Sequence, residues 1–448
     1  MASNGLKSVT IQSLIDDGVI TAHKDGNYGS NYPRTDEFGD DGVPLLTAKL
    51  LDDGGRIDFA SAPRLATEKA NKLTYGFIES NDVLLSHNAT VGRVAVVPEL
   101  TERVLVGTSL TYFRVDTDRL LPRYLAAFFA GRDFQNQLIA VMSHSTRNQV
   151  PITAQRRLTI VVPPLAEQRA IADILGALDD KIELNRRMNE TLEGLARAIF
   201  QSWFVDFDPV RAQRDGLPPP ALSPATAALF PDSFEDSELG KIPKGWEVGS
   251  ILRQADLLSG GTPKTEVPGY WNGDVPWASA KDVSQCGEAF LVSTERTITK
   301  LGVEESSTKI IPAFSTVVVA RGATTGRLTM FGHSMAMNQT CYALRSKVGA
   351  PFALYCNARH FIERLVQGGH GSIFDTITTS TFEATNVLLA PKEVLLAFDN
   401  QVTPLFQQVH ANLHQSRRLA AIRDALLPKL LSGEIRVAEA ERLVEDAG

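Results

Sequence analysis

The sequence of 448 residues has few cysteines and no long apolar run. Its three cysteines, Cys286, Cys341 and Cys356, show no CxxC spacing, so we expect neither a disulfide framework nor a zinc knot. No run of about eighteen apolar residues is present, and a transmembrane helix is therefore not expected. The first residues lack the basic-then-apolar layout of a signal peptide. These absences together predict a cytoplasmic protein.

Motifs for catalysis and for cofactors are also lacking. The sequence has no G-x-x-x-x-G-K-[ST] loop, no G-x-G-x-x-G after a strand pattern and no G-x-S-x-G elbow. His410 and His414 have the spacing of metal ligands on a helix, but no third ligand lies near them in the sequence. Solvated surface positions are the better interpretation of both. We therefore expect no catalytic residue, no cofactor and no metal site.

An excess of basic residues, which would indicate a nucleic-acid partner, is missing as well. The formal net charge is −7. Residues 206–244 hold seven acidic and four basic side chains, and residues 433–448 hold five acidic and two basic ones. The rest of the chain is nearly neutral. The charge therefore permits a DNA-binding surface without predicting one.

What the sequence does contain is an internal repeat. The stretches HNATVGR (87–93) and RGATTGR (321–327) share the pattern Ala-Thr-x-Gly-Arg at a shift of 234 residues. The runs LTIVVPP and TNVLLAP recur at a shift of 227, and a long amphipathic helical pattern follows each. At that shift the apolar stripes superpose, and Asn185 falls on Asn412. The chain is therefore predicted to be a duplication of one globular unit and one long helix.

The predicted fold class is α+β, because each globular unit combines short β-type runs with helical patches. Both units end at a long helix that begins after a proline. The predicted divisions are a first domain at 1–162, a helix at 163–205, a linker rich in proline and acidic residues at 206–244, a second domain at 245–390, a second helix at 391–433 and an acidic tail at 434–448.

Candidate binding residues lie in loops that combine glycine, hydroxyl groups, amides and arginine. Such loops let backbone amides approach phosphate, and arginine can form two hydrogen bonds with guanine. Each loop taken alone fits an ordinary tight turn, but their repetition in equivalent places favours binding. In the first unit the candidates are Tyr28, Arg34, Lys49, His87, Asn88, Thr90, Arg93, Ser145 and Arg147. In the second unit they are Thr262, Lys264, Tyr270, Trp271, Lys281, Arg321, Thr324, Arg327, Gln339, His370 and Ser372.

The order of these features resembles the specificity (S) subunits of type I restriction–modification systems. The resemblance runs over essentially the whole chain. It rests on the stretches IVVPPLAEQRAIADILGALDDKIELNRRMNETLE, LFPDSFEDSELGKIPKGWEV, GGTPKTEVPGYWNGDVPWAS and ALLPKLLSGEI. The first unit lacks the IPKGW opening that the second unit has at 242–246. We therefore expect the two units to recognise different DNA sequences.

The resemblance implies two target-recognition domains, each reading one half of a split site in double-stranded DNA. It also implies that the two helices pack as an antiparallel coiled coil, hold the domains apart and bind two methyltransferase subunits. Restriction/motor subunits would join this core. In this family the S subunit carries no catalytic residue, and the partners supply the chemistry of S-adenosylmethionine and ATP.

Antiparallel pairing would bring the two asparagines together. Residues 165–205 and 392–432 have their centres at Asn185 and Asn412, so the two side chains would meet and fix the helix register. Two other functions stay open: a coiled-coil scaffold that binds only proteins, and a solitary DNA-binding regulator without methyltransferase partners. Co-purification with a methyltransferase, followed by mapping of methylated bases, would separate these alternatives.

Overall fold

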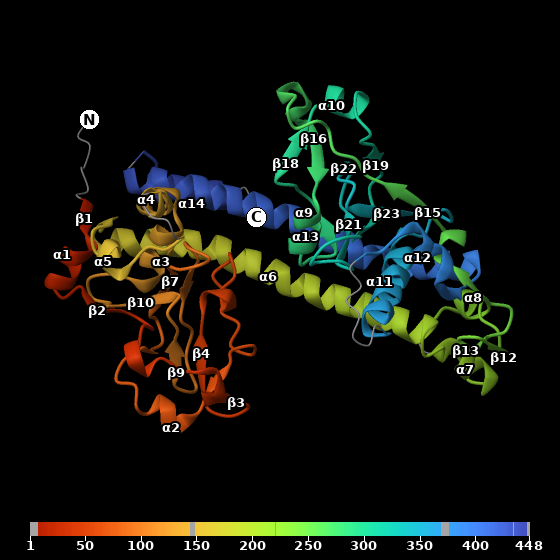
Figure 1. Ribbon diagram of the computed structural model, residues 1–448, viewed down its shortest axis with the longest axis horizontal. Helices are drawn as coiled ribbons and strands as arrows, with labels where there is room; N and C mark the ends of the chain where they lie inside the picture. Colours follow the sequence, from red (N-terminus) through yellow and green to blue (C-terminus); the bar gives the residue numbers. More distant parts are fainter. Residues whose placement is uncertain (1–7, 144–147, 220, 369–375, 433, 446–448) are drawn as a thin grey trace. The chain divides into compact units, whose positions relative to one another are not determined.

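The computed structural model describes residues 8–143, 148–219, 221–368, 376–432 and 434–445. The chain divides into two compact units, of which unit 1 comprises Met1–Glu183 with Gln415–Gly448 and unit 2 comprises Leu184–His414. Each unit contains part of the two long helices α6 (Leu165–Phe204) and α13 (Lys392–Ser432) (Figure 1). In the part of the chain that the structure describes, no helix is long and apolar enough to cross a membrane.

The main sheet of unit 1 is antiparallel and has the strand order β2–β10–β7–β8. Its strands are β2 (Ile20–Asp25), β10 (Leu110–Val115), β7 (Val83–Ser86) and β8 (Val94–Val96). Strand β7 is buried along its whole length, because alternate side chains enter cores on both faces of the sheet. Val83 and Leu85 join the core under the helices α3 (Pro122–Ala130) and α4 (Arg132–Met142), whereas Leu84 points into the opposite core.

A second sheet completes the globular part of unit 1. Its strand order is β3–β5–β4–β9–β6, with β4 and β9 parallel. It lies on the side of unit 1 away from α6 (Figure 1). The strands are β3 (Phe38–Gly39), β5 (Arg64–Leu65), β4 (Val43–Leu46), β9 (Val104–Val106) and β6 (Phe77–Ile78). The remaining elements are β1 (Ser8–Thr10), which pairs with β11 (Thr159–Val161), the helices α1 (Ile11–Asp16), α2 (Thr67–Ala70) and α5 (Ile152–Gln155), and the 3-10 turns η1 (Gly29–Asn31), η2 (Thr35–Glu37) and η3 (Ala48–Leu50).

Unit 2 has a main sheet with the order β15–β23–β20–β21–β17 and a second sheet with the order β18–β16–β22–β19. The main-sheet strands are β15 (Ala255–Ser259), β23 (Cys341–Ser346), β20 (Thr316–Val319), β21 (Leu328–Phe331) and β17 (Phe290–Leu291). The second-sheet strands are β18 (Arg296–Ile298), β16 (Trp271–Ala278), β22 (Met335–Met337) and β19 (Ile310–Ile311). The remaining elements are β14 (Glu247–Ser250), which pairs with β24 (Asn386–Leu389), the helices α9 (Ala280–Gln285), α10 (Lys300–Glu304), α11 (Pro351–Gly368) and α12 (Thr379–Ala384), and the 3-10 turns η4 (Ile251–Arg253) and η5 (Pro268–Tyr270).

The two units repeat one topology, which confirms the duplication. The order β2–β10–β7–β8 in unit 1 corresponds to β15–β23–β20–β21 in unit 2. The parallel pair β4–β9 corresponds to β16–β22, and the pair β1–β11 corresponds to β14–β24. The predicted α+β class is therefore correct. Because the backbone hydrogen bonds repeat along with the order of the strands, the sequence repeat is a repeat of structure.

In unit 2 the two long helices pack antiparallel. The side chain of Asn412 on α13 contacts Asn189 on α6. Further toward the end of α6, the ring of Phe200 lies 5.9 Å from that of Phe398, which comes earlier in α13. Residue numbers therefore rise along α6 in the direction in which they fall along α13, as antiparallel packing requires. Trp203 continues this packing at 5.7 Å from Phe398.

The segments of the same helices in unit 1 also face each other. Arg423 on α13 donates to Asp179 on α6, with Nη1 and Oδ1 2.7 Å apart. Leu178 of α6 and Leu419 of α13 belong to the same buried core. Burial raises the pKa of Asp179, while Arg423 opposes that shift. The ion pair therefore offsets part of the cost of burying the carboxylate.

The seam of α6 differs from its prediction in one respect. The apolar stripe that the sequence predicts for this helix includes Met188 and Leu195, but these are 37% and 50% exposed. The buried face carries Asn189 and Ala196, together with Asn185, which the repeat had placed there. A helix has 3.6 residues per turn, so the buried residues lie on the same face as Leu178. Met188 and Leu195 lie on a neighbouring face that solvent reaches. A search for large apolar side chains misses a face that is built from small and polar ones.

The segment predicted as a linker, 206–244, carries elements of its own. These are the helices α7 (Asp208–Arg214) and α8 (Pro224–Ala227) and a hairpin of β12 (Phe234–Ser237) with β13 (Gly240–Pro243). Val210 and Phe230 are buried in the same core as Trp203 and Trp246. These few apolar anchors hold the segment to unit 2, although they are too sparse to produce a period in the sequence.

The predicted acidic tail likewise contains a helix, α14 (Val437–Glu445). Ala440 on this helix is fully buried in the core of unit 1. The acidic residues therefore describe only the exposed face of this segment. Ala440 packs its other face against the core of unit 1.

Buried asparagines lie between the two helices of unit 2. Asn185, Asn189 and Asn412 are 1%, 1% and 3% exposed. The Asn412 side chain donates to Asn189 Oδ1 at 2.9 Å, and Gln408 donates to Asn412 Oδ1 at 2.7 Å. Asn185 Nδ2 lies 3.5 Å from the main-chain oxygen of Asn412. Asn185 and Asn412 are therefore neighbours, but the side-chain amide of Asn412 pairs with Asn189. Their role in setting the register stays a prediction.

We predict that Asn412→Ala lowers the free energy of unfolding by about 1–3 kcal/mol, because the buried side-chain oxygen of Asn189 loses the hydrogen bond that Asn412 donates to it. Urea denaturation followed by circular dichroism measures this change. The matched control is Asn400→Ala on the same helix, where the side chain is exposed and a change within about 0.5 kcal/mol is expected. Equal effects of the two substitutions would contradict the importance of the asparagine cluster.

Candidate nucleic-acid interface

The repeated loop of unit 1 is a closed hairpin between β7 and β8. Gly92 N–H donates to Ser86 O at 2.9 Å, and Ser86 N–H donates to Arg93 O at 2.8 Å. The Ser86 hydroxyl oxygen also accepts from Arg93 N–H at 2.8 Å. Gly92 has φ of 102°, a conformation that side chains rarely allow. A Cβ atom there would also lie 2.3 Å from Gln135 Oε1. Glycine is therefore required for this turn.

Unit 2 closes the corresponding hairpin between β20 and β21 in the same way. Gly326 N–H donates to Val319 O, and Val319 N–H donates to Arg327 O, both at 2.9 Å. Gly326 also has positive φ, at 87°. The Thr325 hydroxyl donates to Gly322 O at 2.7 Å. The pattern Ala-Thr-x-Gly-Arg thus recurs because both units need the same turn.

Each hairpin is anchored to the segment that precedes the last strand of its unit. In unit 1, Val150 N–H donates to His87 O, and in unit 2, Ile377 N–H donates to Ala320 O, both at 2.8 Å. Isolated β-bridges continue both contacts, one between Asn88 and Gln149 and one between Arg321 and Thr376. The start of each hairpin is therefore fixed by the fold, and the residues that follow it project from a defined position.

His87 is part of a buried polar network and faces away from solvent. It is 1% exposed, and its Nδ1 lies 2.8 Å from the Thr111 hydroxyl. Gln155 donates to the same hydroxyl at 3.0 Å, and its Oε1 lies 3.1 Å from His23 Nε2. Burial lowers the pKa of His23 to about 4 and also lowers the pKa of His87. Both rings are neutral at neutral pH, and we remove His87 from the candidates for DNA contact.

The two arginines that close the hairpins have different surroundings. Arg93 Nε donates to Asp53 Oδ1, and Arg93 Nη1 donates to Leu51 O, both at 2.7 Å. Arg93 therefore holds the loop after η3 in place. The side chain of Arg327 is exposed and makes no hydrogen bond or ion pair with the residues that the structure describes. Of the two, Arg327 is free to meet a ligand.

The other candidates of unit 1 divide into buried and exposed residues. Tyr28 is 5% exposed, and its hydroxyl donates to Val106 O at 2.6 Å. It belongs to the core, and we remove it from the candidates. Arg34 and Lys49 are exposed, whereas Asn88 and Thr90 are half-buried in or beside the hairpin. The candidates Ser145 and Arg147 lie outside the described residues.

Several candidates of unit 2 hold the second sheet together. Trp271 is 7% exposed, and its Nε1 donates to Lys264 O at 3.1 Å. It is therefore a core residue, and we remove it from the candidates. Two further candidates make ion or hydrogen-bond contacts on the surface: Tyr270 donates to Glu305 at 2.7 Å, and Lys281 pairs with Glu295 at 2.7 Å. The Tyr270 hydroxyl and the Lys281 ammonium group therefore have partners within the chain, although neither group is buried.

Thr262 and Gln339 lie together at the base of the unit 2 hairpin. The Thr262 hydroxyl donates to Gln339 Oε1. The next residue, Thr340, accepts a hydrogen bond from Ala320 N–H at 2.8 Å, directly before Arg321. Arg321, Thr324 and Lys264 are exposed. The candidates His370 and Ser372 lie outside the described residues.

Sequence reasoning missed Arg296. This exposed residue of β18 places its guanidinium 3.5 Å from the centre of the Trp271 ring and 5.7 Å from that of Trp277. Stacking orients a charged group without neutralising it. The two tryptophans, six residues apart, could be recognised in the sequence. Arg296 lies on a later strand, and no pattern in the sequence connects it with them.

His410 also differs from its prediction as a solvated surface residue. Its Nε2 lies 2.9 Å from Gly332 O, and its ring centre lies 5.3 Å from that of Phe290. His414 Nε2 lies 3.3 Å from His410 Nε2. The pair therefore joins α13 to the main sheet of unit 2. Across the described ranges, no group of three or more potential metal ligands is found.

Each unit thus offers a hairpin that the same backbone hydrogen bonds close, and the hairpin of unit 2 carries the exposed cationic side chains of Arg321 and Arg327. A family model described as the type I restriction modification DNA specificity domain matches residues 36–194 and 243–418. The chain belongs to this family. Its two matched segments correspond to the two copies of the repeat, so the specificity domain is present twice.

Relatives with the same description extend over most of the chain. The type I restriction enzyme HindI specificity subunit of Haemophilus influenzae is 27% identical over 406 residues, covering 80% of this chain and 87% of the relative. The MjaIX specificity subunit of Methanocaldococcus jannaschii is 27% identical over 425 residues, covering 92% and 91%. The chain is thus a specificity subunit, the non-catalytic, DNA-binding member of such systems.

A solved structure supports the fold. The type I restriction–modification S subunit from M. genitalium matches with a TM-score of 0.52 and 14% identity, over 96% of this chain and 97% of that one. At this identity the match shows the fold alone.

We predict that Arg93→Ala and Arg327→Ala act on different properties. Arg93→Ala should lower the free energy of unfolding by about 1 kcal/mol, because it removes hydrogen bonds that are only partly shielded from solvent. Arg327→Ala should leave stability unchanged and weaken DNA binding by about 1–3 kcal/mol if it contacts a base. Urea denaturation and fluorescence anisotropy of the assembled methyltransferase on its DNA measure the two effects. A loss of stability in Arg327→Ala with intact DNA binding would contradict this assignment.

Proposed function

We propose that this chain reads a bipartite, asymmetric site in double-stranded DNA, with one half of the site read by each of its two globular domains. The observation that carries this proposal is one hairpin backbone with two different sets of side chains. Unit 1 presents Asn88 and Thr90 beside an arginine that is bound internally. Unit 2 presents Arg321, Thr324 and Arg327 on the same backbone. A single scaffold with different side chains favours two different half-sites.

The charge of the chain fits recognition within a larger complex. With a net charge of −7, the subunit alone supplies little of the phosphate attraction that dominates the affinity of DNA-binding proteins. Base contacts would then come from the hairpins, and partner subunits would supply much of the positive surface. The chain would act in the cytoplasm as part of that complex.

An exposed apolar stripe on α6 favours the binding of a partner protein at this helix. Leu184, Met188 and Leu195 are 49%, 37% and 50% exposed. Their spacing of four and seven residues places them on one face of the helix, away from the buried asparagines. Contiguous apolar surface of this kind marks protein contact sites. We assign the stripe to a methyltransferase subunit. Two such subunits, together with the restriction/motor subunits, would complete the assembly.

The alternatives are a coiled-coil scaffold that binds only proteins and a solitary regulator that binds DNA without a methyltransferase. The repeated hairpins argue against the first, and the apolar stripe argues against the second. Purification of the chain with its neighbouring methyltransferase, followed by methylome sequencing, tests the proposal as a whole. Methylation of one split motif supports it, whereas a complex that methylates nothing specific would overturn it.

We predict that exchanging residues 1–162 for those of a relative with another specificity changes one half-site and preserves the other. The reason is that the exchanged segment carries the whole of the first hairpin and its anchor. Methylome sequencing of cells with the chimera and its methyltransferase measures both halves at once. As a control, exchange of residues 245–390 should alter the opposite half. A folded chimera that loses both halves would refute modular reading.

We predict that the double substitution Met188→Lys and Leu195→Lys prevents co-purification with the methyltransferase while the chain stays folded. Both side chains are exposed in the structure, so charge there costs little stability, but it opposes burial in an interface. The control is Ala198→Lys, which adds charge at another exposed position of the same helix. Size-exclusion chromatography of the co-expressed proteins measures assembly. Retention of the complex by the double variant would place the docking surface elsewhere.

A further inference from the structure

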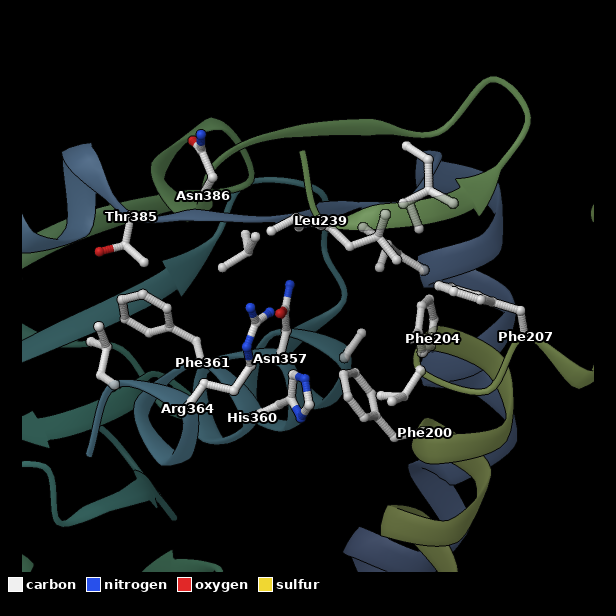
Figure 2. Close-up of a pocket in the computed structure, with 18 of the residues that line it drawn as sticks. Phe200, Phe204, Phe207, Leu239, Asn357, His360, Phe361, Arg364, Thr385 and Asn386 are labelled. Atoms are coloured by element: carbon white, nitrogen blue, oxygen red, sulfur yellow. The ribbon is translucent and has the colours of Figure 1, made fainter. Parts of the chain in front are cut away.

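Unit 2 contains a cavity of about 300 Å³ that the recognition hairpin does not use. It lies between the last turns of α6, the helix α11, the hairpin β12–β13 and the strand β24 (Figure 2). This volume reaches the lower range of small-molecule sites in proteins. The cavity is distinct from the hairpin of residues 319–328, since none of those residues lines it.

Aromatic rings form the apolar walls of this cavity. Phe200 and Phe204 come from α6, Phe207 follows it, and Phe361 comes from α11. Figure 2 shows the ring of Phe361 on one side of the cavity and the rings of Phe200 and Phe204 on the other. Leu239 adds an aliphatic side chain from the β12–β13 turn. A ligand with an apolar body would therefore be well accommodated between these walls.

One face of α11 supplies a row of polar groups. Asn357, His360 and Arg364 are spaced three and four residues apart, which places them in one row along the helix. In Figure 2 the ends of Arg364 and Asn357 lie next to each other and point into the cavity. Neither side chain makes a hydrogen bond or an ion pair with the residues that the structure describes. Burial lowers the pKa of His360, so its ring is a neutral donor or acceptor at neutral pH.

The charged residues that line the cavity are all basic. Arg364 and Lys241 are its cationic residues, and no described residue that lines the cavity is acidic. Lys241 pairs with Asp236 at 3.0 Å on the exposed side, where both side chains are largely accessible to solvent. Arg364 is thus the cation whose charge is unmatched. A guanidinium beside an amide favours a planar carboxylate, which accepts two parallel hydrogen bonds.

The same place in unit 1 is closed by an internal contact. At the shift of 227 residues that relates β11 to β24, Gln137 corresponds to Arg364 and Thr159 to Asn386. The Gln137 side chain accepts from Thr159 N–H at 2.8 Å and donates to Thr159 O at 3.1 Å. Gln137 therefore forms hydrogen bonds with both main-chain polar groups of Thr159 at the edge of β11. In unit 2 the corresponding arginine does not make this contact, and a cavity is left beside it.

We propose that this cavity is a binding site for a small organic carboxylate with an apolar body. The carboxylate lies against Arg364 and Asn357, and the apolar body lies between the phenylalanine rings. The site is independent of DNA reading, and its occupant contacts both α6 and the recognition domain of unit 2. Its size suits an aliphatic or aromatic acid of about eight to ten carbon atoms.

Isothermal titration calorimetry of the full-length chain with octanoate, in the absence of DNA, tests the proposal. We expect saturable binding of one octanoate per chain, and binding of the uncharged octanol at least about tenfold weaker, since the alcohol cannot pair with the guanidinium. Arg364→Gln should weaken octanoate about tenfold and leave octanol unchanged. Because Arg364 is exposed, this substitution keeps the fold.

Two further variants make the result specific to the cavity. Leu239→Trp, in the β12–β13 turn, should fill the space and weaken the binding of octanoate and octanol alike. Lys309→Gln removes an exposed cation elsewhere in unit 2 and should leave octanoate binding unchanged. The proposal is overturned if octanoate shows no saturable binding, if octanol binds equally well, or if Arg364→Gln and Lys309→Gln have equal effects. None of these measurements depends on DNA, so failure here leaves the proposed DNA reading untouched.

Discussion

The structure depends above all on the burial of one face of α6 against one face of α13. In unit 2 this contact combines aromatic packing around Phe398 with a cluster of buried asparagines. In unit 1 it combines leucines with the ion pair of Asp179 and Arg423. The recognition domains share these cores, so each domain folds onto the helices that it belongs to. We expect the polar cluster in this apolar seam to cost stability and to disfavour other registers of the helices.

Duplication gave the two units one backbone, while their side chains serve different purposes. The closing arginine of the hairpin is bound internally in unit 1 and exposed in unit 2. The strand edge that Gln137 satisfies in unit 1 borders a cavity with Arg364 in unit 2. Backbone hydrogen bonds that close a turn tolerate few residues, whereas exposed positions on the turn tolerate many. A repeat of this kind can therefore keep its geometry and change its specificity.

The same distinction explains what could be predicted from the sequence. The repeat, the α+β class and the long helices were predictable, because glycine turns and apolar periods leave a direct signal. The burial of Tyr28, His87 and Trp271 was not, since polar and aromatic loop residues read alike whether they face solvent or a core. The repeat placed Asn185 on the buried face of α6, but Asn189 and Ala196 were missed there because neither is a large apolar residue. Arg296 was missed because its stacking on Trp271 joins segments far apart in the chain.

For a chain that reads a split site, we propose that the paired helices set, through their length, the distance between the two halves of the DNA site. This proposal is tested by inserting one helical turn of four residues after Glu183 in α6 and after His414 in α13, where the units adjoin in the sequence. The insertion adds about 6 Å and nearly preserves the buried face, since a turn has about 3.6 residues. At about 3.4 Å per base, methylome sequencing should show both half-sites unchanged and their spacer lengthened by about two base pairs. Efficient methylation at the original spacer would contradict the account.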